Sequence, residues 1–126
     1  MKNVGSTQKN FDLDLEYGQQ GEDHVLSLLN GAKKVEVKTD KFAHYTQRLS
    51  IEYKYKGKPS GISTTEADYW AFLIPQTQTV IFIPTAKLKE MCKLCYKMNH
   101  KTDGGDHHAS WLIHVPLWMV VQYQNI

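Results

Sequence analysis

Alternation of apolar and polar residues over two neighbouring segments constrains the fold more than any other feature of this sequence. In Lys34–Asp40 the apolar side of an extended chain carries Val35, Val37 and Thr39, and the other side is charged. In Arg48–Tyr55 the apolar side carries Leu49, Ile51, Tyr53 and Tyr55. A period of two fits a strand and not a helix. Both segments are therefore predicted to be strands with one buried face.

The remaining patterns predict an α/β protein. Val25, Leu26, Leu28 and Leu29 form an apolar stripe that predicts a helix within 11–30, ended by Asn30-Gly31. The apolar runs 68–74 and 79–84 predict two buried strands. Helical spacing predicts a helix over 86–99 with Thr85 as its N-cap. Residues 110–122 predict a strand, a break at Pro116 and a further short strand or helix.

A length of 126 residues with 41% hydrophobic residues predicts a single domain over 1–126. The polar segment 1–10 lacks an apolar core, so we expect a flexible end and no export signal. No apolar run is long enough to span a bilayer, so no membrane association is expected. Two cysteines without an export signal favour a reducing compartment. We expect a cytoplasmic protein, of a cell or of a virus-infected host cell.

Charge is distributed unevenly, although the formal net charge is only +2. Residues 33–58 hold eight basic residues against three acidic ones, and residues 86–101 hold five lysines against Glu90. Clustered cations of this kind are typical of proteins that bind a polyanion. The predicted partner is therefore a nucleic acid.

Two acidic residues and a lysine suggest a metal site. If the two alternating strands pair as neighbours, Asp40 at the end of one lies near Glu52 and Lys54 on the other. Carboxylate oxygens are hard ligands that suit Mg²⁺, with Mn²⁺ as a substitute, and the Tyr53 backbone carbonyl could add a ligand. A lysine beside such a metal could orient a water molecule and stabilise developing charge on a phosphate.

The spacing of Asp40 and Glu52-Tyr53-Lys54 resembles the D…ExK signature of the PD-(D/E)XK nuclease superfamily, over roughly Gly18 to Pro84. The stretch from Ser60-Gly61-Ile62 to Trp70 looks like small phage-encoded members, and Holliday-junction resolvases belong to the same superfamily. The resemblance implies a restriction-endonuclease-like αβββαβ core with a central mixed sheet flanked by helices. It also implies a magnesium-dependent DNA endonuclease that is selective for junctions or branched DNA.

The implied catalytic residues are Glu22, Asp40, Glu52 and Lys54. Glu22 shares the apolar face of its helix, which is explained either by a snorkelling edge position or by a carboxylate that binds a second ion or the water network. The expected DNA-binding residues are Arg48, Lys56, Lys58, Lys89, Lys93 and Lys97. Many enzymes of this kind are dimers, and the apolar C-terminal segment could form the homodimer interface.

Several alternatives stay open. Glu36-Val37-Lys38 is a second ExK, whose charged residues are interpreted as supporting or DNA-facing groups. The alternating charges could instead be a solvated strand face, and the protein a non-catalytic nucleic-acid-binding protein on the same fold. Cys92 and Cys95, with His100, His107 and His108, could mark a zinc-stabilised interaction module. Both cysteines lie on the apolar stripe, so buried thiols are the preferred interpretation.

Overall fold

The computed structural model describes residues 19–20, 22–24, 26–27, 30–31, 34–103 and 109–123. The chain divides into two units, Met1–Lys33 and Lys34–Ile126, and each is described by itself. In the first unit the described residues between 19 and 31 are helical, which confirms a helix there. The predicted flexible segment 1–10 lies outside the described residues.

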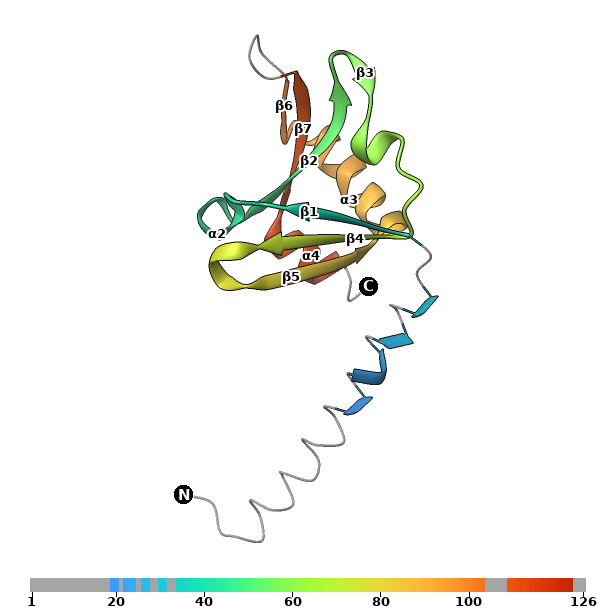
Figure 1. The fold of residues 1–126 in the computed structure, drawn as a ribbon. Helices are drawn as coiled ribbons and strands as arrows, with labels where there is room; N and C mark the ends of the chain where they lie inside the picture. The colour runs from blue at the N-terminus through green and yellow to red at the C-terminus, as the bar shows by residue number, and fades with distance from the viewer. Residues whose placement is uncertain are drawn as a thin grey trace, which may run out of the picture. The chain divides into compact units, whose positions relative to one another are not determined.

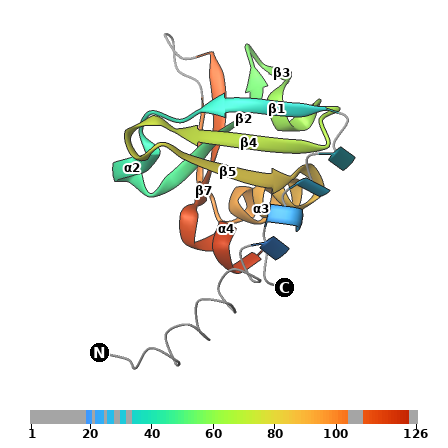
Figure 2. The same ribbon diagram turned by 60° about the horizontal axis from the view of Figure 1, so that its bottom comes forward.

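The second unit contains two sheets (Figure 1). The first is mixed and has the order β1 (Val35–Thr39), β4 (Tyr69–Ile74), β5 (Thr79–Pro84). Within it β1 is parallel to β4, and β4 is antiparallel to β5. The second is antiparallel and has the order β3 (Lys58–Pro59), β2 (Arg48–Tyr55), β7 (Ser110–Pro116), β6 (Lys101–Thr102). The long strands β2 and β7 run across the strands of the mixed sheet (Figures 1 and 2).

Short helices connect and cover these strands. They are α2 (Ala43–Thr46), α3 (Thr85–Lys97), α4 (Leu117–Tyr123) and the 3₁₀ turns η1 (Gly61–Ser63) and η2 (Pro75–Thr77). Helix α3 contacts β4 and β5 of one sheet and β7 of the other, and α4 packs on α3 and β7 (Figure 2). Helix α3 therefore joins the two sheets.

The core lies where the sheets and α3 meet. Its largest fully buried side chains include Trp70 and Phe72 of β4, Leu49 and Ile51 of β2, and Leu88 and Met91 of α3. On β2 the buried residues alternate with more exposed ones, as the period-two pattern predicts. Burial of each such side chain contributes about 1.5–3 kcal/mol to the hydrophobic free energy of folding.

The α/β class is confirmed, and strands form where they were predicted. The predicted burial is wrong for two of them, because β1 exposes Val37 and Thr39 and β5, at the edge of its sheet, exposes Thr79 and Val80. The expectation that the two alternating strands pair does not hold, because β1 pairs with β4 while β2 pairs with β3 and β7. A turn that contains α2 redirects the chain between them. Thr85 is not a side-chain cap: it is the first residue of α3, and its Oγ1 donates to the Ala67 carbonyl at 2.7 Å. Among the described helices, none has the length and apolarity that crossing a bilayer requires.

Candidate functional site

The carboxylate of Asp40 is buried and holds the corner between β1 and β2. Its Oδ1 accepts hydrogen bonds from the backbone amides of Phe42, at 3.0 Å, and Ala43, at 2.9 Å. Its Oδ2 accepts one from the Ser50 amide at 3.1 Å. An ionised carboxylate offers about four acceptor positions, so three are taken by the backbone. This arrangement gives Asp40 a structural role, and a metal ion would have to compete with it.

Glu52 is partly exposed on β2 and makes two side-chain hydrogen bonds. Ser60 Oγ donates to Oε2 at 3.0 Å, and Ser110 Oγ donates to Oε1 at 2.7 Å. Two of its roughly four acceptor positions are therefore filled by hydroxyl groups, which can rotate to other partners. Glu52 is held in place and keeps the capacity to bind a cation.

The turn at Ser60-Gly61 supports this part of β2. The Ser60 amide and Ser63 Oγ both donate to the Tyr53 carbonyl, at 3.1 and 2.8 Å. A carbonyl oxygen has two lone pairs, so the Tyr53 carbonyl predicted as a metal ligand has neither lone pair free. Gly61 has a φ of +52°, and a Cβ there would overlap the backbone carbonyl of Glu52. The sequence pattern Ser60-Gly61-Ile62 thus has a structural explanation, as the support beneath Glu52 and Tyr53.

Lys54 does not accompany Glu52. The register of β2 against β7 shifts between these two residues, so Glu52 lies opposite Leu112 and Lys54 opposite Trp111. Trp111 and Leu112 are neighbours on β7, so their side chains point to opposite faces of the sheet. Glu52 and Lys54, which lie opposite them, therefore point to opposite faces as well. Lys54 Nζ lies 5.0 Å from the centre of the Trp111 ring, while Glu52 binds Ser110. The expectation that Glu52 and Lys54 share one strand face is therefore wrong.

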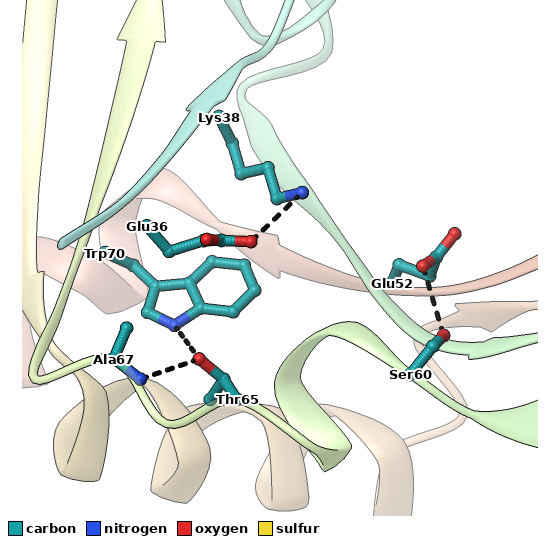
Figure 3. A network of polar contacts seen from close by, with 7 residues as sticks. All are labelled: Glu36, Lys38, Glu52, Ser60, Thr65, Ala67 and Trp70. Carbon is teal, nitrogen blue, oxygen red and sulfur yellow. Dashed lines mark hydrogen bonds and ion pairs between the residues drawn. The ribbon is translucent and has the colours of Figure 1, made fainter. Parts of the chain in front are cut away.

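Glu36 and Lys38 on β1 form a second acid–base pair. Lys38 Nζ lies 3.4 Å from Glu36 Oε1, and both side chains are partly exposed. The register pairs Glu36 with Trp70, and Lys38 Nζ is 5.9 Å from the Trp70 ring centre. In Figure 3 both side chains extend from β1 in the direction of β2, the strand that carries Glu52. A solvent-exposed ion pair of this kind contributes only about 0–1 kcal/mol to stability, so stability does not explain it well.

Among the candidate carboxylates, Glu36 on β1 and Glu52 on β2 keep acceptor positions for a hard cation, and they lie on different sheets. Within the described parts of the chain, no group of three His, Cys, Asp or Glu side chains is placed to hold a metal ion. Glu22 lies in the first unit, where it is helical and exposed. Its predicted role as a ligand stays a prediction.

The expected DNA-binding cations fall into two groups. Arg48, Lys56 and Lys58 are exposed on β2, the following turn and β3. Lys89, Lys93 and Lys97 line a cavity beside α3. Lysines four residues apart lie on one side of a helix, so this row is continuous. Both groups are accessible to a polyanion.

Cys92 and Cys95 are free thiols in the core, which agrees with the preferred interpretation of buried cysteines. Burial, reinforced by the nearby Cys95, raises the pKa of Cys92 to about 12. Burial also raises the pKa of Cys95, whose Sγ lies 3.6 Å from Met119 Sδ. Zinc binds the thiolate form, and this environment favours the protonated thiol. His107 and His108 lie outside the described residues.

The structure contains a buried hydrogen-bond network around His114 that the sequence did not predict. His114 is buried, with Nδ1 at 3.0 Å from Ser50 Oγ and Nε2 at 2.6 Å from Thr102 Oγ1. Burial, followed by the positive charge of Arg48, lowers the pKa of His114 below its ordinary value. The neutral imidazole therefore joins β2, β7 and β6. Only strand pairing brings Ser50 and Thr102 to this histidine, so no local pattern could have revealed it.

Comparisons with protein-family models, with curated proteins and with solved structures found no match to this chain.

Proposed function

We propose that this protein is a metal-dependent DNA endonuclease whose catalytic residues are Glu36, Lys38 and Glu52. The observation that carries the proposal is the direction of the Glu36 and Lys38 side chains, which extend from β1 toward the strand of Glu52 (Figure 3). The carboxylates of Glu36 and Glu52 have acceptor positions left, whereas Asp40 and the Tyr53 carbonyl already accept hydrogen bonds from the protein. The ExK spacing of the superfamily is then supplied by Glu36-Val37-Lys38.

The residues of the chain have distinct tasks in this proposal. Glu36 and Glu52 would hold Mg²⁺ or Mn²⁺, which supplies an activated water and neutralises charge on the phosphate. Ser60 and Ser110 fix the orientation of the Glu52 carboxylate. Lys38 forms an ion pair with Glu36 and would stabilise negative charge that develops on the phosphate oxygens. Asp40 fixes the corner between the two catalytic strands.

The surrounding fold and charge support DNA as the substrate. A mixed sheet that carries an acid–x–lysine strand at its edge is compatible with a restriction-endonuclease-like core. Arg48, Lys56 and Lys58 supply exposed cations on the sheet that bears Glu52. We expect selectivity for branched DNA or junctions. Free buried thiols suit a reducing compartment such as the cytoplasm.

The test combines metal binding with cleavage. Glu36→Gln and Glu52→Gln should weaken Mn²⁺ binding in calorimetric titrations and abolish cleavage of a panel of branched and linear DNAs. Lys38→Ala should keep the metal and lower the cleavage rate by about 10²–10³. Lys54→Ala is the matched control, since its ammonium lies on Trp111 and its rate should stay near that of wild type.

Two outcomes would reject this assignment. A large loss of rate in Lys54→Ala with normal cleavage by Lys38→Ala would return the site to Asp40, Glu52 and Lys54. Unchanged Mn²⁺ titration curves in both glutamine variants would remove these carboxylates from any metal site.

Nucleic-acid binding without catalysis is the second candidate function. It is favoured by the lysine row on α3, which needs no metal to bind phosphates. Under this alternative no DNA in the panel is cut in Mg²⁺ or Mn²⁺, while DNA binding persists in chelator. The homodimer stays a prediction, for which the exposed Trp118 and Val121 of α4 offer an apolar surface.

A further inference from the structure

A groove beside α3 combines an apolar floor with a row of cations. Its cavity volume is about 510 Å³, which lies within the range of small-molecule sites. Lys89, Lys93 and Lys97 line it from the helix, and Tyr53, Ile62 and Tyr96 contribute apolar and aromatic surface. We call this cavity the α3 groove.

Aromatic rings form one end of the α3 groove. Tyr96 is 45% exposed, and the Lys101 ammonium lies over one face of its ring, so a ligand would stack on the part of the ring that Lys101 leaves open. The Tyr96 ring meets the buried Tyr53 edge to face, with ring centres 5.7 Å apart and planes at 81°. Tyr53 is in turn fixed by Trp111, so the exposed ring rests on a rigid base. A flat ring that enters the groove would find a pre-formed surface.

The charge of the α3 groove selects an anion. None of the side chains that line it is acidic within the part of the chain that the structure describes. Lys101 Nζ lies 4.1 Å from the centre of the Tyr96 ring and adds a further cation at the aromatic end. An apolar, aromatic floor beside several ammonium groups matches a ligand with both a flat ring and a phosphate. A nucleotide has these two parts.

The α3 groove is linked to the proposed catalytic residues through one turn. Ser60 donates to the Glu52 carboxylate, and three residues later Ser63 lines the groove and donates to the Tyr53 carbonyl. Glu52 and Tyr53 are adjacent on β2, and their side chains belong to opposite faces. The turn therefore supports Glu52 on one side and lines the α3 groove on the other.

We propose that the α3 groove binds one unpaired nucleotide of the DNA substrate, with its base on Tyr96 and its flanking phosphates on Lys93 and Lys97. The inference deepens the proposed function and rests on it for the source of the nucleotide. It explains how an enzyme without a separate DNA-reading domain would select branched DNA, in which unpaired nucleotides are exposed. Base stacking tolerates any sequence, so selection would depend on structure.

The test measures binding without cleavage, as fluorescence anisotropy of a labelled oligo(dT) strand in Ca²⁺ at fixed salt. Tyr96→Ala should weaken binding by about tenfold or more, since stacking on one aromatic side chain carries this much affinity. Tyr96→Phe keeps the ring and should bind within about twofold of wild type. Tyr45→Ala removes an exposed tyrosine on α2 and is the matched control, with affinity near that of wild type.

Equal losses in Tyr96→Ala and Tyr45→Ala, or no loss in either, would overturn the proposal. Competition by free dTMP as strong as by the strand would reassign the α3 groove to a free nucleotide. Strand binding measured in chelator separates the two proposals, because the α3 groove needs no metal ion to bind phosphates. If Tyr96→Ala weakens binding but no DNA is cut, the endonuclease proposal is rejected and the groove proposal stands. If DNA is cut but Tyr96→Ala binds like wild type, the groove proposal is rejected and the endonuclease proposal stands.

Discussion

At the scale of single residues, two carboxylates that look equivalent along the chain have different surroundings. Asp40 is 9% exposed and receives three backbone amides. Glu52 is less buried and receives two serine hydroxyls. Backbone amides are fixed by the fold, whereas hydroxyl groups rotate. The first environment stabilises structure, and the second is suited to exchange a partner for a cation.

Asp40→Asn should therefore act on stability. The asparagine amide would replace one acceptor oxygen with a donor that faces a backbone N–H, and a buried unsatisfied group costs about 1–3 kcal/mol. Urea unfolding should show this loss, while Mn²⁺ binding by the folded variant stays near that of wild type. A variant with unchanged stability and lost metal binding would make Asp40 a ligand after all.

His114 should make stability depend on pH. Its pKa in the folded protein is lowered, first by burial and then by Arg48, while Asp40 opposes the shift and His100 reinforces it. The unfolded chain therefore binds the proton more readily. The contribution of His114 is fully present above its unfolded pKa of about 6.5 and is lost as the pH falls through the lower folded value.

Urea unfolding at several pH values between 5 and 8 measures this dependence. Wild type should lose stability toward acid, and His114→Gln should lose less over the same interval. Parallel curves for the two proteins would show that other groups cause the acid loss.

At the scale of elements, the turn after β3 decides how β2 presents its residues. Gly61 adopts a φ of +52° and lies against the Glu52 carbonyl, while Gly57 adopts a φ of +78° and a Cβ added there would meet no atom within 4 Å. The two glycines therefore separate backbone strain from steric overlap. A side chain at Gly57 meets only strain, and one at Gly61 meets both.

Gly61→Ala should destabilise the protein more than Gly57→Ala. Positive φ costs an alanine about 1–2 kcal/mol, and at Gly61 the overlap with Glu52 adds to this. Thermal unfolding should rank the variants in this order, and Gly61→Ala should also lower Mn²⁺ affinity by displacing Glu52. Equal losses of stability would mean that the turn moves away freely, and that Glu52 does not depend on it.

At the scale of the whole molecule, local clustering of charge matters more than the net charge of +2. The exposed cations of β2 and β3 and the lysine row of α3 each supply positive potential in one place. DNA binding to such clusters releases counterions, so affinity falls as salt rises. The slope of log K against log salt therefore measures the number of phosphate contacts.

Replacing Lys89, Lys93 and Lys97 together with alanine should lower the slope of log K against log salt. Each lost phosphate contact on duplex DNA lowers it by about 0.9, so a full loss of three contacts lowers it by about 2.7. Lys41→Ala removes an exposed lysine that belongs neither to the β2–β3 cations nor to the α3 row, and it should leave the slope near that of wild type. An unchanged slope in the triple variant would remove the α3 row from the DNA interface.

The sequence by itself determined the elements that depend on local periodicity. The strand Arg48–Tyr55 and the apolar stripe of α3 with its buried cysteines were predicted, because alternate or helically spaced side chains share a face whatever they pack against. The same rule placed Glu52 on the less buried face of β2, but for β1 it chose the wrong face, because Val37 is exposed and Lys38 lies beside the buried Trp70.

Only the tertiary structure decided which of these residues meet. Strand partners depend on long-range packing, so the assignment of β1 to one sheet and β2 to another carries no local signal. The register shift after Glu52, which sends Lys54 to Trp111, depends on the partner strand β7. The backbone amides that surround Asp40 come from a turn and from Ser50, ten residues away. The sequence therefore identified which residues carry charged or nucleophilic groups, and only the three-dimensional fold determined which of them lie together.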